Sequence, residues 1–170
     1  MSKSPHKSTG TPATAALVRA GVPHLLHPYE HDPRARYFGE ETAQALNVDE
    51  RRVFKTLVIE VSSAPHPLVT AVIPAGNHLD LKSIAGLAQG KHAELADPAL
   101  AQRITGFVRG GISPLGQKKQ TPVLVDDSAS HWETIYISAG RRGLSVEIAP
   151  GDLVRVTSAF CAPISRPGLH

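Results

Sequence analysis

Residues 53–61, VFKTLVIEV, are the stretch that decides the fold. They are rich in β-branched side chains, which predicts the strongest strand of the chain. Residues 68–73, LVTAVI, predict a second strand, and His66 and Pro67 mark the turn between the two. The sequence therefore predicts a sheet that contains both strands.

Outward from these strands, helices and strands mix without a regular alternation. Further strands are predicted at residues 24–29, 92–95, 122–125, 134–138 and 144–148. Helices are predicted at residues 12–20, 39–46, 81–87, 98–104 and 149–156. This pattern predicts an α+β fold, a single compact domain with a mixed, barrel-like β-sheet flanked by helices. We expect a flexible N-terminal tail at residues 1–10, the domain at residues 11–165 and a C-terminal tail at residues 166–170, frayed from Ser165.

Composition excludes several classes of protein. The chain has 170 residues, of which 41% are hydrophobic and 19% charged, as in an ordinary one-domain globular protein. Its longest apolar runs fall far short of a membrane span. Cys161 is the only cysteine, so no intramolecular disulfide or cysteine-based zinc site can form, and we expect a small buried thiol. Residues 1–10 hold no apolar segment, so we expect no signal peptide and a cytoplasmic location.

Positive charge is concentrated in part of the chain. The net charge is +3, and residues 98–125 contain no Asp or Glu. The cations within that segment are Arg103, Arg109, Lys118 and Lys119, and residues 51–52 and 141–142 are pairs of arginines. If the fold brings these side chains together, they form a patch for phosphate groups; otherwise they are separate solvated charges.

Lys55 is the first candidate functional residue. Because side chains alternate between the two faces of a strand, Lys55 shares its face with apolar side chains only. These are Val53, Leu57, Ile59 and Val61. A lysine is poorly placed there unless a cleft opens beside it, where it can stabilise an oxyanion, hold a phosphate or act as a base. The alternative is a lysine near a strand end whose ammonium reaches the solvent.

Residues 109–116, RGGISPLG, form the second candidate site. The paired glycines Gly110 and Gly111 let a backbone approach a ligand closely and expose N–H groups that bind a carbonyl or a phosphate. The spacing is not that of a P-loop. An ordinary tight turn is the alternative interpretation.

Other catalytic patterns are weak. His24, His27 and His31 cluster, but His24 and His27 would face opposite ways on a strand and no HExxH motif is present, so we expect no metal site. No GxSxG motif marks a nucleophilic serine. An enzyme built on this sequence thus lacks an obvious protein nucleophile.

Several blocks, in order along the chain, resemble a known family. They are TPA at residues 11–13, HPYEHDP at 27–33, FGEE at 38–41, FKTL at 54–57, LDLK at 79–82, ADP at 96–98, AQR at 101–103, TG at 105–106, GGISPLGQKK at 110–119, IYIS at 135–138 and RGL at 142–144. Over residues 11–165 the chain resembles the YbaK-type Cys-tRNA(Pro) deacylases. These are aminoacyl-tRNA editing domains related to the insertion domain of prolyl-tRNA synthetase.

The resemblance implies an editing domain that hydrolyses the ester joining a misattached cysteine to the 3′ end of the proline tRNA. It implies that Lys55 is the key catalytic lysine and that Gly110 and Gly111 contact the ester through their backbone. The substrate-binding residues implied by the match are Tyr29, Phe38, Thr56 and Ser138. No cofactor and no metal ion are expected. The thiol of the bound cysteine would attack its own ester carbonyl, a step that gains its rate from proximity.

The implied partners are a mischarged tRNA, held at its acceptor end, and prolyl-tRNA synthetase, which would supply specificity for the tRNA. The residues expected to contact the RNA backbone are Arg51, Arg109, Lys118 and Lys119. No membrane partner is expected. Three alternatives stay open: editing of alanine or serine on the same fold, a tRNA-binding module without catalysis, and a metal hydrolase.

One position departs from the family pattern. After the RGL block the related proteins carry an aspartate, whereas this chain has Ser145. Glu147 lies on the same strand face two residues further along and is a candidate to supply the missing charge. Ser145 is therefore not counted among the catalytic residues.

Overall fold

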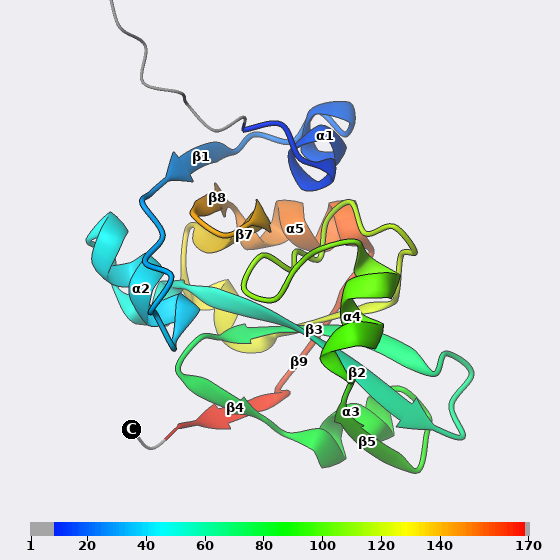
Figure 1. The fold of residues 1–170 in the computed structure, drawn as a ribbon. Coiled ribbons are helices and arrows are strands. Elements are labelled where there is room, and N and C mark those ends of the chain that lie inside the picture. Colours follow the sequence, from blue (N-terminus) through cyan, green and yellow to red (C-terminus); the bar gives the residue numbers. More distant parts are fainter. Residues whose placement is uncertain (1–8, 169–170) are drawn as a thin grey trace, which may run out of the picture.

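The computed structural model describes residues 9–168, and Figure 1 shows their arrangement. The helices are α1 (Pro12–Arg19), α2 (Phe38–Leu46), α3 (Leu81–Leu87), α4 (Pro98–Thr105) and α5 (Pro150–Thr157), with short 3-10 helices η1 (Glu50–Arg52) and η2 (Asp127–His131). The strands are β1 (Leu25–Pro28), β2 (Phe54–Ser62), β3 (Leu68–Pro74), β4 (Asn77–Leu79), β5 (His92–Leu95), β6 (Val123–Asp126), β7 (Ile135–Arg141), β8 (Leu144–Ile148), β9 (Phe160–Ala162) and β10 (Ser165–Pro167). All the predicted α-helices are present, with ends within one residue of the predicted ones.

The strands form one mixed sheet and two smaller antiparallel ones. The five-stranded sheet has the order β5-β2-β3-β6-β9. In it β2 pairs antiparallel with β3 and β5, whereas the β3–β6 and β6–β9 pairs are parallel. The second sheet has the order β1-β8-β7, and a bridge between Val53 and Tyr136 joins it to the start of β2. This arrangement confirms the α+β class and the mixed sheet.

Strand β2 separates two hydrophobic cores. Phe54 packs on one side with Val72 and with the inner side chains of β7 and β8. Ile59 and Val61 pack on the other side with Ile84 of α3. Because both faces of β2 are covered by apolar side chains, a charged side chain on this strand needs an opening beside it.

The C-terminal end is more ordered than predicted. Residues Ser165–Pro167 form β10, which pairs antiparallel with β4; Figure 1 shows it as the red strand beside β4, close to the C-terminus. The expectation of fraying from Ser165 is therefore wrong for these residues. Strands β4, β9 and β10 were not predicted, because three residues are too few to show a side-chain alternation.

Parts of the two predicted tails, residues 1–8 and 169–170, lie outside the described residues. Within residues 9–168 no helix has the length and the apolar character needed to cross a membrane.

Candidate active site

A cavity of about 300 Å³ opens between β2, α2, the loop at residues 109–112 and strands β7 and β8. The predicted site residues that line it are Tyr29, Phe38, Lys55, Thr56, Arg109, Gly110 and Ser138. Gly111 lies next to the lining, and Arg51, Lys118 and Lys119 lie outside it. The fold thus brings together most of the predicted catalytic and substrate-binding residues from segments far apart in the sequence.

Lys55 is half-buried in the wall of this cavity, near the start of β2. Within residues 9–168 its ammonium forms no ion pair with a carboxylate. Burial lowers the pKa of the Lys55 ammonium below its ordinary value, because partial desolvation penalises the charged form more than the neutral amine. The wall of the cavity therefore holds a half-buried cation whose charge a ligand can neutralise.

Thr56 has a buried hydroxyl group without a hydrogen-bond partner among the described residues. Its side chain is only 8% exposed, yet it lines the cavity. Among the described residues its Oγ1 is the one buried side-chain polar atom without a hydrogen-bond partner. A buried hydroxyl without a partner costs free energy, so a polar atom of a ligand that bonds to it would recover that cost.

The phenol of Tyr29, which also lines the cavity, is held in a chain of hydrogen bonds. Thr42 Oγ1 donates to the Phe38 carbonyl at 2.9 Å, and its 2.8 Å contact with Tyr29 Oη must then use the tyrosine proton. Burial is the largest of the causes that raise the Tyr29 pKa. The Tyr29 oxygen is thus left as an acceptor toward any ligand.

Close packing explains the paired glycines. Gly110 has φ +83°, and a Cβ there would stand 3.0 Å from the ring of Phe38. A Cβ on Gly111 would stand 2.8 Å from the Cα of Arg141, which is backbone and cannot move aside cheaply. Both positions therefore require glycine for packing, whatever the loop does to a substrate.

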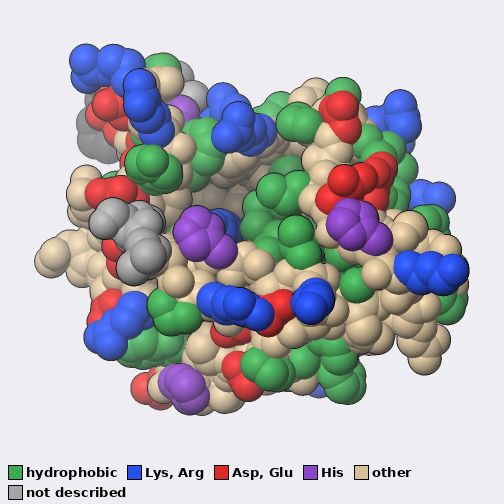
Figure 2. All heavy atoms as spheres, turned by 90° about the horizontal axis from the view of Figure 1, so that it is seen from below, with side chains coloured by type: hydrophobic (Ala, Val, Ile, Leu, Met, Phe, Trp, Pro, Cys, Tyr) green, Lys and Arg blue, Asp and Glu red, His purple; other side chains and the backbone are tan. Residues whose placement is uncertain are grey.

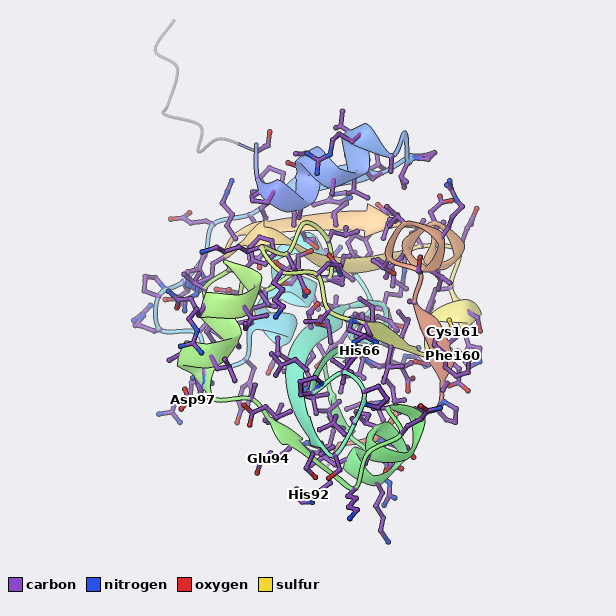
Figure 3. The ribbon with its side chains drawn as sticks, turned by 90° about the vertical axis from the view of Figure 1, so that its right-hand side faces the viewer. His66, His92, Glu94, Asp97, Phe160 and Cys161 are labelled. Carbon is purple, nitrogen blue, oxygen red and sulfur yellow. The ribbon has the colours of Figure 1, made fainter. Side chains whose placement is uncertain are left out.

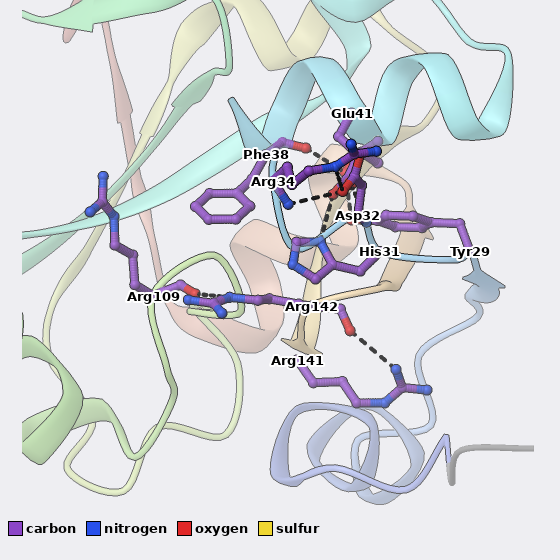
Figure 4. Close-up of polar contacts among 10 residues, drawn as sticks. Tyr29, His31, Asp32, Arg34, Phe38, Glu41, Arg109, Arg141 and Arg142 are labelled. Atoms are coloured by element: carbon purple, nitrogen blue, oxygen red, sulfur yellow. Dashed lines mark hydrogen bonds and ion pairs between the residues drawn. The ribbon is translucent and has the colours of Figure 1, made fainter. Parts of the chain in front are cut away.

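Arg142 fastens residues 106–122, the loop between α4 and β6 that we call the glycine loop, to the wall of the cavity (Figure 4). Its Nε donates to the Arg109 carbonyl at 2.6 Å, and its guanidinium lies 5.3 Å from the centre of the Phe38 ring. His31 packs against the same ring, with centroids 5.9 Å apart, and bonds to Glu41 at 2.8 Å. The loop is thus joined at Arg109 to α2, through Arg142 and the Phe38 ring.

Gln117 holds the later part of the same loop, residues 113–121, against β3. Its amide nitrogen donates to Thr70 Oγ1 at 3.0 Å and to the Ser113 carbonyl at 3.2 Å. Its amide oxygen accepts from the backbone N–H and the hydroxyl of Thr121, at 3.2 and 2.9 Å. A 2.6 Å bond between Thr70 and Thr121 closes the ring of partners. The sequence showed Gln117 only as part of a matching block, because a sequence does not show that the loop folds against Thr70 of β3.

Ser145 and Glu147 do not rebuild the missing acid of the family pattern. Ser145 lines the cavity, and its buried hydroxyl donates to the Ile137 carbonyl at 3.1 Å, a bond that an ionised aspartate could not make. Glu147 bonds instead to His27 at 2.9 Å and to Thr134 at 2.5 Å. It lies outside the cavity lining, so the structure does not support it as a replacement charge beside Lys55.

The predicted cations do not gather at the cavity. Arg109 lines it, whereas Arg51 pairs with Asp49 at 2.7 Å and Lys118 and Lys119 are exposed in the later part of the glycine loop. On the face shown in Figure 2, Lys and Arg side chains stand among acidic and hydrophobic ones rather than in one block. Arg36, which the sequence analysis did not single out, lines the cavity as well.

Two further expectations concern Cys161 and the histidines. Cys161 is exposed, so the expected buried thiol is wrong: β9 is an edge strand, and Figure 3 shows Cys161 beside Phe160 at that edge. Within residues 9–168 no three His, Cys, Asp or Glu side chains are placed to hold a metal ion. The three histidines have different partners. His24 bonds to the Val22 carbonyl, His27 to Glu147 and His31 to Glu41.

Known proteins share both the sequence pattern and the fold. A model of the aminoacyl-tRNA editing domain matches residues 32–156, which contain α2, β2, the glycine loop and strands β7 and β8. EbsC of Enterococcus faecalis (strain ATCC 700802 / V583), described as a proposed Cys-tRNA(Pro)/Cys-tRNA(Cys) deacylase, is 38% identical over 126 residues. That match covers 74% of this chain and 76% of EbsC.

Two solved structures extend the likeness to the whole domain. Hypothetical protein APE2540 has a TM-score of 0.80 at 24% identity, over 92% of this chain and 100% of that one. A proposed trans-editing enzyme for prolyl tRNA synthetase has a TM-score of 0.78 at 22% identity, over 97% and 99% of the two chains. These structures show the shared fold. The domain match across the elements that build the cavity, together with the identity to EbsC, shows that this chain belongs to the aminoacyl-tRNA editing domain family.

Proposed function

We propose that this protein is a trans-editing deacylase that hydrolyses the ester of mischarged Cys-tRNA(Pro). The observation that carries the proposal is the half-buried Lys55 ammonium, which faces a small cavity without a carboxylate partner among the described residues. A cation in that setting is suited to stabilise the oxyanion that forms when an ester carbonyl is attacked. The family membership and the activity named for EbsC support the same conclusion.

In the proposed reaction the attacking group comes from the substrate. The thiol of the bound cysteine loses its proton and its sulfur bonds to the ester carbonyl carbon, which places a negative charge on the carbonyl oxygen. Lys55 and the backbone at Gly110 stabilise that charge. Collapse breaks the bond to the tRNA oxygen, which takes up a proton, and releases a cyclic thioester that water opens to cysteine. Proximity of thiol and carbonyl supplies the rate, so no protein nucleophile is needed.

The size of the cavity fits an amino acid rather than a nucleotide with its amino acid. About 300 Å³ is the lower end of the range for ligand pockets. The aminoacyl group therefore enters, while the rest of the tRNA stays outside. Prolyl-tRNA synthetase is the proposed partner that presents the tRNA, in line with the description of one structural relative.

The test is deacylation of purified aminoacyl-tRNAs, measured as release of the labelled amino acid. The substrates are Cys-tRNA(Pro), Cys-tRNA(Cys), Pro-tRNA(Pro), Ala-tRNA(Pro) and Ser-tRNA(Pro), each with wild type, Lys55→Ala and Lys82→Ala. Lys82 is exposed on α3 outside the cavity, so its removal controls for the loss of one positive charge. We expect rapid loss of the cysteine esters only, abolished in Lys55→Ala and unchanged in Lys82→Ala.

Other outcomes separate the alternatives. Equal cleavage of Ser-tRNA(Pro) excludes the thiol-assisted route, because serine has no thiol. Preference for the alanine or serine ester assigns the cavity to another editing specificity. Binding of tRNA without hydrolysis of any ester, with the synthetase present, makes the protein a binding module. Loss of activity in a chelator would point to a metal hydrolase.

A further inference from the structure

The mouth of the cavity can be located by exposure. Most lining side chains are buried or half-buried, and the exposed ones mark the rim. The exposed lining residues are Arg36, Tyr37, Glu40, Glu50 and Arg109. Tyr37 is the only aromatic residue in this set, and it is 65% exposed. Its position between the cavity and the solvent is where the nucleotide bearing an amino acid would lie.

Tyr37 occupies a helix N-cap, a position at which a small polar residue is normally found. It is the N-cap of α2, where Ser, Thr, Asp or Asn normally accepts a hydrogen bond from the helix. Thr11, Asp80 and Asp97 do so at the starts of α1, α3 and α4, whereas Tyr37, like Ala149 at the start of α5, makes no such bond. A large aromatic ring that does not cap its helix and is exposed at the mouth of a cavity is a candidate contact for a ligand.

The charges around Tyr37 favour a neutral ligand group over a phosphate. At the rim two arginines stand against two glutamates, so no excess of positive charge concentrates there. Tyr37 also borders a second, open hollow beside α2, whose lining includes Arg36 together with Glu30 and Glu40. Carboxylates repel a phosphate but accept hydrogen bonds from the amino group of a nucleobase.

We propose that the ring of Tyr37 is the stacking platform for the terminal base of the RNA that carries the amino acid. The inference rests on the proposed function, which puts the aminoacyl group inside the cavity and leaves its nucleotide at the rim. Unpaired bases are commonly bound by stacking on exposed aromatic rings, a contact that depends little on which base is present. The base stacks at the rim, and Lys55 meets the ester inside.

The test is a binding cycle with uncharged RNA, so that it does not depend on catalysis. A hairpin of the proline acceptor stem ending in CCA is compared with the same hairpin whose last residue lacks its base. Affinities are measured by fluorescence anisotropy for wild type, Tyr37→Ala, Tyr37→Trp and Phe160→Ala. Phe160 is 59% exposed on β9 outside the cavity, so it controls for the loss of an exposed aromatic ring.

We expect wild type to lose about 5- to 150-fold in affinity when the base is removed, the range for one stacked base. Tyr37→Ala should bind the intact hairpin more weakly than wild type by the same factor. Removal of the base should not weaken the binding of Tyr37→Ala any further. Tyr37→Trp should keep the preference, and Phe160→Ala should match wild type. Equal affinity of wild type for the two hairpins, or an unchanged base preference in Tyr37→Ala, overturns the inference.

The inference and the proposed function can fail separately. A base preference that depends on Tyr37, in a protein that cleaves no ester, leaves the stacking platform in place and removes the deacylase proposal. Deacylation that is equally fast on substrates with and without the terminal base keeps the deacylase and removes the platform.

Discussion

Lys55 is a cation that the fold keeps half-buried, and its pKa is lowered for that reason. If the protonated form stabilises the oxyanion, kcat/KM must fall as pH rises through this lowered pKa, since the charge is present only below it. We therefore predict an alkaline limb in the pH profile of Cys-tRNA(Pro) cleavage at a pH below the ordinary lysine pKa. Lys55→Arg should move the limb upward, because a guanidinium stays protonated. An alkaline limb at the same pH in Lys55→Arg assigns that limb to another group.

Thr56 gives a prediction in which stability and activity change in opposite directions. Thr56→Val keeps the shape and removes the buried hydroxyl that has no partner among the described residues. The free energy of unfolding should rise by about 1–3 kcal/mol, the cost of an unpaired buried hydroxyl. The kcat/KM should fall by about tenfold if a ligand bonds to that hydroxyl. Chemical denaturation and deacylation rates measure the two effects, and Thr56→Ser, which keeps the hydroxyl, should resemble wild type in activity.

At the scale of structural elements, the cavity depends on a loop that is fastened at both ends. Arg142 holds it at Arg109, through the carbonyl of that residue and the Phe38 ring. We predict that Arg142→Ala lowers kcat/KM by about tenfold, because one charge-assisted hydrogen bond and one cation–π contact are lost. Arg142→Lys should not restore activity, since an ammonium cannot both donate from that position and stack on the ring. Full rescue by lysine would show that only the charge of Arg142 matters, and Arg34→Ala, an exposed arginine nearby, is the control.

Gln117 holds the later part of the loop, and its removal should affect stability first. Gln117→Leu leaves the hydroxyls of Thr70 and Thr121 and the carbonyl of Ser113 with fewer partners in a buried site. We predict a loss of about 2–4 kcal/mol in the free energy of unfolding. Gln120→Leu is the matched control, because Gln120 is exposed on the same loop and its amide bonds to the Pro114 and Thr121 carbonyls rather than to buried hydroxyls. Urea denaturation measures the free energy of unfolding of both variants. Equal losses in the two would contradict an anchoring role for Gln117.

The sequence predicted elements better than it predicted the contacts between them. Helix caps and β-branched runs act locally, so the helices and the longer strands were found from their patterns. The rim residues Arg36 and Tyr37 carry no local signal, since their position at the cavity depends on the loop and strand that fold against α2. Lys55 was predicted to lie beside a cleft because a lysine is poorly placed on an apolar strand face, and it does line the cavity. The exposure of Cys161 was missed because a sequence does not show which strand lies at the edge of a sheet.

At the scale of the whole molecule, the small net charge limits how tightly the domain can hold a tRNA. The chain has a net charge of +3, and on the face shown in Figure 2 cations and anions are mixed. Such a surface suits a few phosphate contacts rather than a continuous track, which fits the proposal that a partner presents the tRNA. The four cations expected to contact the RNA, Arg51, Arg109, Lys118 and Lys119, are all exposed.

These charges predict the salt dependence of binding. Each neutralised phosphate contributes about 0.9 to the slope of log Kd against log salt concentration on duplex RNA, if it behaves as duplex DNA does. Four contacts therefore predict a slope of about 3 to 4. Replacing both Lys118 and Lys119 with alanine should lower the slope by about 1 to 2 and weaken binding of all tRNAs alike, because phosphates carry no sequence. The cleavage rate of bound Cys-tRNA(Pro) should stay the same, since neither lysine lines the cavity. An unchanged slope in the double variant would place the tRNA on another face of the domain.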